Sequence, residues 1–332
     1  MVIDMKTTIY LVRHGEAEGN LCRRMHGHYD SNLTCRGLRQ VRNLADRFAE
    51  LPVDACYASD LTRAKNTAQA VCIPHGLPLY LEPAFREVAV GCWEDRSFGS
   101  LQLFDDEKMQ RFLRDPVHWI VDGGETYECY TGRFLSALDR LVQVHSGQNI
   151  AIVTHSIVMK AVLQRLFPEI PIPHSANTSV TQLEWEQGHY HLTMLNDSSH
   201  LSEELSRPPR RLERETIWFR EGWTELSLNA PKTEIAYTVM QEQTPIGLVC
   251  LELRPPEGIV PFFGLLPQWR GCGLGVRLIG KAISVLRASG MEKMICCGED
   301  CAETLALWKK LPFEEKGSEC WILDLRPQIR EF

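Results

Sequence analysis

The strongest constraint on the fold is a pattern that recurs three times: a short apolar, β-prone run ends at a polar step that carries or precedes a basic side chain. The three runs are Thr8 to Val12 before Arg13-His14-Gly15, Val53 to Ala58 before Ser59-Asp60, and Asn149 to Val153 before Thr154-His155-Ser156. Runs of this length and composition predict buried strands. Ligands of open α/β sheets bind at the carboxyl ends of such strands, so the pattern predicts a pocket lined by histidine and arginine.

Segments with helical periodicity or helix-start signals separate these strands. The expected helices are Leu38 to Glu50, a helix capped by Ser59-Asp60 with Arg63 in its first turn, Leu101 to Leu113, Thr126 to His145 and Ile157 to Leu166. Further strands are expected at Leu77 to Leu81, where the signal is weak, and as a closing pair at Val180 to Leu183 and His191 to Leu195. Alternating strands and helices predict a mostly parallel sheet with right-handed crossovers. The strands of such a sheet end on one side, so Arg13, His14, Arg63 and His155 are expected to meet in one pocket.

The length of 332 residues is comfortable for two domains. A Pro- and Arg-rich stretch that starts at Ser206 interrupts the succession of predicted strands and helices. Domains are therefore expected at 1–205 and 213–332, with a linker at 206–212. The net charge of -7 arises in the first part, because the residues from Ser206 onward hold 17 basic and 17 acidic side chains. Neither part is basic, which argues against nucleic acid or an anionic membrane as the main partner.

The twelve cysteines are scattered and form no tight framework. Cys296, Cys297 and Cys301 are clustered, but no second pair of cysteines or histidines stands at a spacing typical of zinc ligands, so no metal site is expected. The N-terminus runs into a strand without an apolar signal core, and no apolar run is long enough to span a bilayer. Free thiols and a cytoplasmic location are therefore expected.

The residue types at the strand ends suit the binding of a phosphate group. Arg13 and Arg63 would supply the charged, forked donors that bind a phosphate dianion bidentately. Asn20 and His155 would complete the cradle. The alternative for a single histidine after a strand is a packed loop residue, and the partners on the other strands favour the phosphate site.

The same pocket offers a nucleophile and an acid. His14, as a neutral imidazole, can attack phosphorus and form a phosphohistidine that water then hydrolyses. Glu87 is the best-placed carboxyl to protonate the leaving alkoxide, provided that burial or neighbouring charge keeps it protonated. The arginines offset the developing charge, so this chemistry needs no metal.

Four ordered motifs make residues 6–200 resemble the histidine phosphatase superfamily, which is phosphoglycerate mutase-like. The motifs are Arg13-His14-Gly15-Glu16 with Asn20, Ser59-Asp60-Leu61-Thr62-Arg63-Ala64, Arg86-Glu87 with Gly91-Cys92-Trp93-Glu94, and Thr154-His155-Ser156. The resemblance implies a three-layer α/β sandwich. It also implies His14 as nucleophile, Glu87 as proton donor, and Arg13, Arg63 and His155 as phosphate ligands.

Within this family, the sequence favours a phosphatase of a small phosphorylated metabolite. About seventy residues separate Glu87 from His155, whereas mutases of this kind tend to carry a longer insertion there, and the Gly-x-Trp-Glu run is similar to that of small phosphatases. A phosphoglycerate mutase-type phosphotransferase is the alternative. Arg24 stands where relatives carry a substrate-facing arginine, so Asn20 and Arg24 are candidate substrate-binding residues.

Other polar residues near this first motif have two open interpretations. Glu16, Glu18, His26 and His28 either line the mouth of the pocket or are solvated loop residues.

A second set of motifs follows the linker. The expected elements are an amphipathic helix at Leu212 to Leu226, strands at Glu234 to Met240 and Ile246 to Leu253, an apolar run at Val260 to Leu266, and a helix at Val276 to Ser289. A glycine-rich turn precedes that last helix, an arrangement in which backbone N–H groups hold a pyrophosphate. This turn, Arg270-Gly271-Cys272-Gly273-Leu274-Gly275, fits the R-x-x-G-x-G motif of GNAT acetyltransferases. The segment Leu305 to Glu314 resembles the closing motif of the same family.

This second resemblance covers about residues 215–325 and implies a smaller α+β domain. It implies an acyl-CoA site, for acetyl-CoA or another acyl-CoA, at Arg270, Gly271, Cys272, Gly273, Leu274 and Gly275. Trp308 replaces the tyrosine that commonly protonates the CoA thiolate, and an indole cannot supply that proton. Pro312 replaces a glycine, and the segment before the turn is short for the two helices that shape the acceptor side.

The function of the second domain therefore stays open between three alternatives. It transfers acyl groups in a bifunctional protein, senses acyl-CoA without turnover, or provides an oligomerisation surface. Cys272 is expected to be a loop thiol rather than a nucleophile. The sequence does not indicate the oligomeric state.

Overall fold

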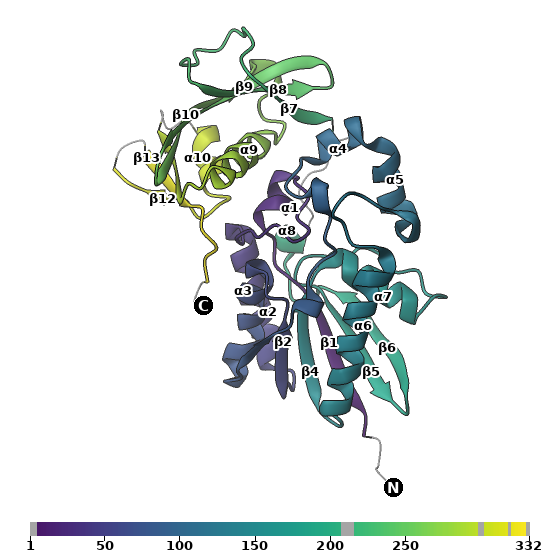
Figure 1. Cartoon of the computed structure of the whole chain (residues 1–332). Coiled ribbons are helices and arrows are strands. Elements are labelled where there is room, and N and C mark those ends of the chain that lie inside the picture. Colours follow the sequence, from purple (N-terminus) through teal and green to yellow (C-terminus); the bar gives the residue numbers. More distant parts are fainter. Residues whose placement is uncertain (1–4, 207–215, 298–301, 318–319, 330–332) are drawn as a thin grey trace.

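Two sheets organise the chain, one in each half of the sequence (Figure 1). The computed structural model describes residues 5–206, 216–297, 302–317 and 320–329. The first half contains β1 (Thr7–Arg13), α1 (Glu18–Cys22), α2 (Cys35–Ala49), β2 (Ala55–Ala58), α3 (Thr62–His75), β3 (Leu79–Leu81), α4 (Phe98–Phe104), α5 (Asp106–Arg114), α6 (Tyr127–Val144), β4 (Asn149–Thr154), α7 (Ser156–Leu166), β5 (Val180–Glu186), β6 (His189–Asp197) and α8 (Glu203–Ser206).

The first sheet has the strand order β3-β2-β4-β1-β5-β6. The four strands β3, β2, β4 and β1 pair in parallel, whereas β5 and β6 add an antiparallel edge to β1. The expected parallel sheet is therefore present, and the predicted hairpin around Gln187-Gly188 closes it. Because β1, β2 and β4 run in the same direction, their carboxyl ends lie at one edge, which faces the second half of the chain (Figure 1).

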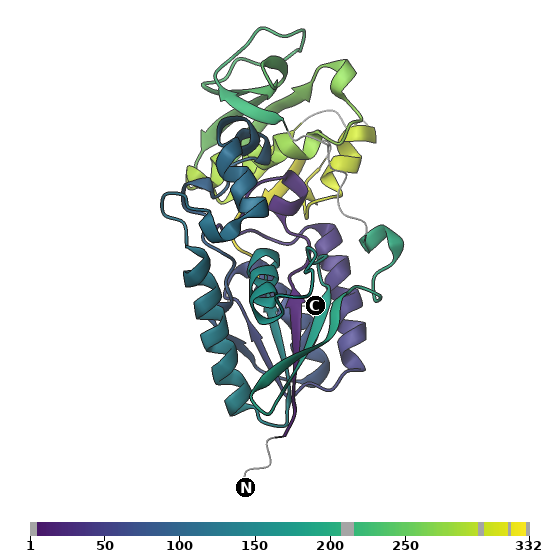
Figure 2. The same ribbon diagram turned by 90° about the vertical axis from the view of Figure 1, so that its right-hand side faces the viewer.

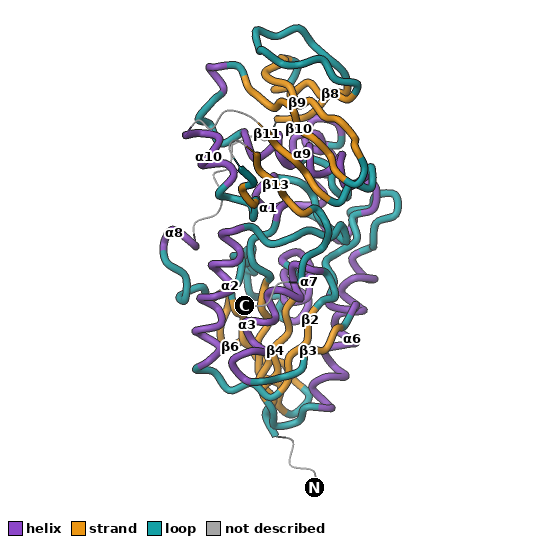
Figure 3. The backbone as a smooth tube through the Cα atoms, turned by 90° about the vertical axis from the view of Figure 1, so that its left-hand side faces the viewer, coloured by secondary structure: helices purple, strands orange, loops and turns teal. Residues whose placement is uncertain are grey.

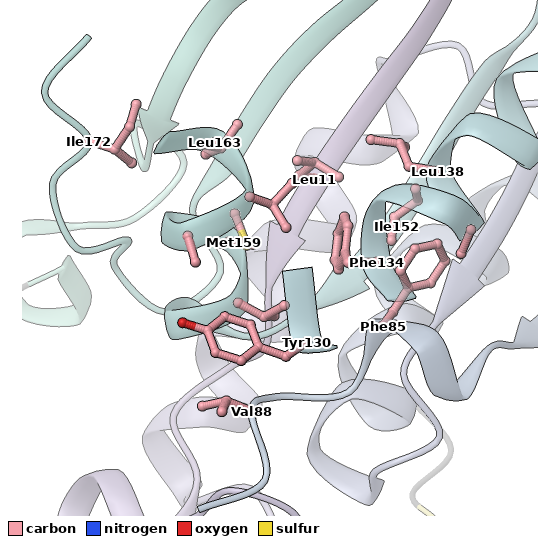
Figure 4. Packing of buried hydrophobic residues seen from close by; sticks show 14 of the residues in the cluster. Leu11, Phe85, Val88, Tyr130, Phe134, Leu138, Ile152, Met159, Leu163 and Ile172 are labelled. Carbon is pink, nitrogen blue, oxygen red and sulfur yellow. The ribbon is translucent and has the colours of Figure 1, made fainter. Parts of the chain in front are cut away.

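Helices cover both faces of this sheet and make a three-layer α/β sandwich (Figure 2). On one face, side chains of β1 and β4 such as Leu11 and Ile152 pack against Phe134 and Leu138 of α6 and Met159 of α7 (Figure 4). On the other face, Val12 and Val153 pack with α2 and α3 (Figure 3). Strand residues are buried on both faces, which explains why these strands read as continuous apolar runs.

The second half folds around a seven-stranded sheet of order β12-β13-β11-β10-β9-β8-β7. Its elements are β7 (Ile217–Glu221), β8 (Ile235–Gln241), β9 (Thr244–Arg254), β10 (Glu257–Leu265), α9 (Gly275–Ala288), β11 (Lys293–Cys297), α10 (Ala302–Trp308), β12 (Glu314–Glu315) and β13 (Cys320–Asp324). Among the described strands of this sheet, β10 and β11 pair in parallel and the other neighbours are antiparallel. The predicted strands, the glycine-rich turn and the helix after it are all present.

Three element predictions are wrong in detail. The expected helix at Leu212 to Leu226 is strand β7 in its described part, because its apolar residues complete the edge of the sheet beside β8. The expected helix at Leu101 to Leu113 is two helices, α4 and α5, with a break at Asp105 (φ -134°). Ser59-Asp60 does not cap α3, since Asp30 accepts hydrogen bonds from the backbone N and the hydroxyl of Thr62 at 2.8 and 2.7 Å.

The two halves are in direct contact. Helix α9 lies on α1, and β7 lies on α4 (Figure 1). An added Cβ at Gly99 of α4 would lie 1.9 Å from the carbonyl oxygen of Ile217, so that glycine permits the second contact. The predicted linker at 206–212 lies, apart from Ser206, outside the described residues. In the part of the chain that the structure describes, no helix has the length and apolar character needed to cross a membrane.

Candidate active site

The first pair of site residues follows the two central strands. In the parallel pairing of β1 with β4, Arg13 lies opposite Thr154, and the backbone N of His14 donates to the carbonyl of Thr154 at 3.0 Å. The next residue on each strand is thus a histidine, and the rings of His14 and His155 lie 5.0 Å apart between centroids. Both side chains are buried, with exposed fractions of 3% and 0%. The structure thus places these two candidate site residues side by side.

The ring nitrogens of His14 have different surroundings. Nδ1 lies 2.7 Å from the carbonyl oxygen of Gly15, which fixes the proton on Nδ1 because a carbonyl can only accept. The lone pair is then on Nε2, which is the nitrogen that can attack phosphorus. Asn177 also donates to the carbonyl of His14 at 2.9 Å, so the backbone of the nucleophile is held from the segment before β5.

The third strand end contributes Arg63. This arginine is the second residue of α3 and is completely buried. Its two terminal nitrogens donate to the carbonyls of Tyr29 and Gly27 at 3.0 and 2.8 Å. Its Nε, together with both ring nitrogens of His155, has no hydrogen-bond partner among the described residues. Buried donors without partners are costly, so these nitrogens mark a place where an anion fits.

Arg13 approaches the same edge from β1. Its Nη1 donates to the carbonyl of Ser175, and its backbone N donates to the carbonyl of Ser179 at 3.1 Å. The hydroxyls of these two serines are buried without a hydrogen-bond partner among the described residues. The segment 174–179 therefore holds Arg13, a contact that the sequence analysis did not predict. The run of small polar residues before β5 was the available signal.

Glu87 reaches the site in a loop and faces the first turn of α7. Its Oε1 accepts from the backbone N of Val88 and Val158 at 3.1 and 2.9 Å, and Oε2 accepts from Ile157 at 3.1 Å. Helix α7 begins directly after His155, so this contact brings the carboxyl group and His155 to the same place. Donors of a helix N-terminus stabilise a carboxylate, which is the form that Glu87 takes after it has given up a proton.

Arg133 is a second residue that the sequence analysis missed. It reaches from α6 and donates to the carbonyls of Arg86 and Glu87 at 2.9 and 2.8 Å, and it pairs with Glu125 at 2.8 Å. It therefore fixes the loop that carries Glu87. Its helical surroundings in the sequence gave no signal for this role.

The electrostatics keep the histidines neutral. Burial, and then the charges of Arg63 and Arg13, hold the pKa of His14 well below its usual range. Burial, and then the charge of Arg63, do the same for the pKa of His155. Burial lowers the pKa of Arg63 to about 10, which leaves this arginine charged at neutral pH. The pocket thus combines neutral imidazoles with cationic guanidinium groups, as phosphate binding and nucleophilic attack require.

The two predicted substrate-binding residues serve other contacts in this structure. The side-chain oxygen of Asn20 accepts from the backbone N of Ala17 at 3.0 Å, which leaves only its Nδ2 to donate to a phosphate. Arg24 binds Asp95 through Nε at 2.6 Å and Ser284 of α9 through Nη2 at 2.9 Å. Its guanidinium group therefore joins the two halves of the chain, and its role in substrate binding stays a prediction.

Of the four residues with two open interpretations, Glu16, Glu18 and His26 are not solvated loop side chains. Glu16, Glu18 and His26 are buried, at 2%, 4% and 9% exposed, and His28 is partly buried. Glu16 accepts from Thr34 and pairs with Arg36, and His26 Nε2 accepts from the backbone N of Gly19 at 2.8 Å. They build the loop between β1 and α2 rather than offering charge to solvent.

The predicted glycine-rich turn lies directly before α9. Gly271 and Gly273 adopt φ values of 72° and 77°, and an added Cβ on either would meet no atom of the described residues within 4 Å, so both border open space in that part of the chain. The first turn of α9, from Gly275, follows Leu274. Cys272 is exposed, and its Sγ contacts the carbonyl of Arg270 at 3.6 Å.

The structure shows where two of the departures from the GNAT pattern lie, namely Trp308 and the short segment before the glycine-rich turn. Trp308 is 4% exposed and packs against Phe263, Phe313 and Trp321, so it is a core residue of the second half. Between β7 and β8, residues 222–234 contain no helix.

Of the clustered cysteines, Cys296 is buried and Cys301 lies outside the described residues. The described residues hold no group of three or more His, Cys, Asp or Glu arranged to bind a metal ion.

Comparisons with known proteins agree with both motif sets. Residues 9–198 match the model of the histidine phosphatase superfamily (branch 1), and residues 198–313 match that of the acetyltransferase (GNAT) family. The chain is 32% identical over 158 residues to an adenosylcobalamin/alpha-ribazole phosphatase of Escherichia coli (strain K12), covering 48% of this chain and 78% of that protein. A metal-independent phosphoserine phosphatase of Arabidopsis thaliana is 31% identical over 200 residues, 59% of this chain and 84% of that protein.

Solved structures resemble the first half in the same way. Bacillus stearothermophilus YhfR has a TM-score of 0.56 and 32% identity, covering 58% of this chain and 98% of that chain. A phosphoglycerate mutase of Bacillus anthracis str. Sterne has a TM-score of 0.54 at 21% identity, covering 60% of this chain and 96% of that chain, which supports the fold.

Proposed function

Because the chain belongs to the histidine phosphatase superfamily, we propose that it hydrolyses phosphate monoesters through a phosphohistidine formed on His14. The observation that carries this proposal is the arrangement around the two histidines. His14 presents a neutral Nε2 beside His155, and the guanidinium group of Arg63 completes the phosphate cradle with its Nε, which has no partner among the described residues. Arg13 adds a second charged fork from β1. In a buried site, such donors stabilise the charge that develops on the phosphoryl oxygens.

In the first step, Nε2 of His14 forms a bond to phosphorus while the ester P–O bond breaks. The electron pair of the broken bond goes to the leaving alkoxide, which takes a proton from the carboxyl group of Glu87. The contacts of Glu87 with the N-terminus of α7 stabilise the resulting carboxylate. Arg13 and Arg63 offset the negative charge throughout, so the step requires no metal ion.

In the second step, water attacks the phosphorus of the phosphohistidine. The carboxylate of Glu87 takes a proton from this water, the P–N bond breaks, and its electron pair returns to His14. Orthophosphate leaves, and Glu87 is protonated for the next cycle. The N–H group of His155 donates to the phosphoryl group in both steps.

The substrate class that this site supports is a small phosphorylated metabolite. Every cradle residue recognises the phosphoryl group, which all monoesters share, and the relatives include an alpha-ribazole phosphatase and a phosphoserine phosphatase. Transfer of the phosphoryl group to a second hydroxyl, as in a mutase, is the competing outcome. It would appear as phosphorylated acceptor in place of orthophosphate when a polyol is added.

The test is hydrolysis of p-nitrophenyl phosphate in the presence of a chelator. We expect wild-type activity to persist and His14→Ala to lose at least about 10³-fold in kcat, since the nucleophile cannot be replaced. His191→Ala is the matched control, because His191 is exposed on β6. Equal activity of the His14→Ala variant and the wild type would rule out the assignment.

For the second half, the observations favour binding of acyl-CoA over transfer of the acyl group. The open space at Gly271 and Gly273 and the adjoining start of α9 fit a pyrophosphate on backbone N–H groups, with Arg270, Cys272, Leu274 and Gly275 completing the turn. When bound, acyl-CoA would supply an activated thioester. The buried indole of Trp308 offers no proton to a thiolate.

Calorimetry with acetyl-CoA tests this second proposal. We expect the wild-type chain to bind and Gly273→Glu to lose binding, because a carboxylate would occupy the open space and repel the pyrophosphate. Release of CoA with a panel of amines would instead establish acyl transfer. No heat of binding in the wild type would reject the proposed site.

A further inference from the structure

The second half of the chain is packed against the loop that carries the phosphate site. Helix α9 lies on α1, and an added Cβ at Gly280 would lie 2.5 Å from Cβ of Cys22, so the two backbones approach closely. Arg277 of the same helix donates to the carbonyl of Leu21 at 3.2 Å. Helix α1 follows the nucleophile by only a few residues.

Arg287, in the last turn of α9, makes a bidentate ion pair across this interface. It binds Glu18 of α1 with both terminal nitrogens, at 2.6 and 3.1 Å, and its Nη1 lies 3.4 Å from the hydroxyl of Tyr29. The side chains of Arg287 and Glu18 are 13% and 5% exposed. Loss of one partner of such a pair leaves the other charge buried without compensation, which destabilises the loop that carries it.

Tyr29 connects this contact to the phosphate cradle. Its hydroxyl faces Arg287, and its carbonyl oxygen accepts from Nη1 of Arg63 at 3.0 Å. The carbonyl of Gly27, two residues earlier, holds Nη2 of Arg63 at 2.8 Å. The loop that Arg287 clamps is therefore the loop that orients both terminal nitrogens of Arg63.

The segment after β13 holds the same loop from a second direction. Asn32 donates to the carbonyl of Arg326 at 2.9 Å and accepts from the backbone N of Gln328 at 2.8 Å. Asn66, three residues after Arg63 in α3, donates to the carbonyl of Gln328 at 2.7 Å. The second half thus contacts both the loop and the helix that position Arg63.

We propose that Arg287 is a positioning residue for phosphate binding, and that the GNAT-like domain is a structural part of the phosphatase site. Through Glu18 and Tyr29, Arg287 fixes the loop whose carbonyls aim Arg63 at the phosphoryl group. The inference rests on the proposed phosphate chemistry at Arg63, but it concerns binding and does not depend on turnover.

The experiment measures the KM of p-nitrophenyl phosphate and, by calorimetry, the Kd of inorganic phosphate for the full-length chain. Arg287→Met removes the charge and keeps the length of the side chain. We expect it to raise both constants about tenfold, the effect of weakening one charge-assisted contact, while kcat changes less. Arg287→Lys, which retains the charge, is expected to recover part of this loss. Arg254→Met is the matched control, because Arg254 pairs with Glu252 on the exposed surface of the same domain.

A double-mutant cycle separates positioning from general destabilisation. If Arg287 acts through Arg63, Arg287→Met will have no further effect on the Kd of phosphate in an Arg63→Met background. The inference would be overturned if the two substitutions weakened phosphate binding independently, so that their fold-changes in Kd multiplied in the double variant. It would also be overturned if folded Arg287→Met had the same Kd and KM as the wild type. If Arg287→Met does not fold, Glu18→Gln is measured in its place with the same expectations. A wild type that binds phosphate but hydrolyses no ester would reject the proposed function and leave this test intact.

Discussion

At the scale of single residues, the site depends on which atoms are already engaged. The contact of His14 Nδ1 with a carbonyl leaves the lone pair on Nε2, the atom that we propose as the nucleophile. Neither ring nitrogen of His155 has a hydrogen-bond partner among the described residues. Glu87 differs from both, because its two oxygens are held by backbone N–H groups of Val88 and α7. Its proposed role as proton donor can be tested directly through the leaving group.

The leaving group provides that test. Glu87→Gln keeps the shape of the side chain but cannot donate a carboxyl proton, so a poor leaving group will suffer most. We expect kcat/KM to fall about 10²- to 10⁴-fold for an alkyl phosphate and much less for p-nitrophenyl phosphate, whose leaving group needs little protonation. The measurement is kcat/KM across a series of esters with leaving groups of increasing pKa. An equal loss for all esters would show that Glu87 acts only through structure.

At the scale of elements, the placement of Arg63 depends on the start of α3. Asp30 provides the cap of this helix from a distant loop, through its contacts with the backbone N and hydroxyl of Thr62. The next residue of the helix is Arg63. The same loop thus fixes both the start of the helix and, through Gly27 and Tyr29, the guanidinium group.

Removal of this cap will weaken the fold measurably. We expect Asp30→Ala to lower the free energy of unfolding by about 1 kcal/mol, the usual effect of losing a capping side chain. Urea denaturation measures the difference, with Asp46→Ala on the exposed face of α2 as the control. If both variants have the same stability as the wild type, Asp30 does not cap α3.

The strand ends could be predicted from sequence, and the loops could not. The apolar runs before His14 and His155 specify buried parallel strands, and parallel pairing then brings the two histidines together without further information. Arg24 and Asp30 lie in a loop whose partners are distant in sequence, so nothing local indicates that one binds Ser284 and the other caps α3. Strand β7 was misassigned as a helix for a similar reason, because its partner β8 decides its conformation.

At the scale of the whole molecule, the second domain lies over the edge of the first sheet that carries the proposed phosphate site (Figure 1). The site is deeply buried, and three neutral histidines lie in or beside it. Burial is the main cause that holds the pKa of His14, His26 and His155 well below its usual range. The unfolded chain therefore binds more protons than the folded chain below a pH of about 6.5.

This difference makes the protein acid-sensitive. Stability rises with pH wherever the unfolded state binds more protons, so the free energy of unfolding will fall as the pH is lowered from 7 to 5. Each of the three histidines contributes at most about 1.4 kcal/mol per pH unit. Denaturant titrations at several pH values measure the slope, which His155→Asn is expected to reduce. A stability that is constant over this range would contradict the neutral, buried state of these histidines.

The central claim is that His14 carries the phosphoryl group, and trapping the intermediate tests it most directly. The chain is mixed rapidly with p-nitrophenyl phosphate, quenched in alkali, where phosphohistidine survives, and analysed by intact mass and peptide mapping. We predict one added phosphoryl group on the peptide that contains His14, absent from His14→Ala. A phosphoryl group mapped to another residue, or hydrolysis without any phosphorylated chain at the earliest times, would contradict the account.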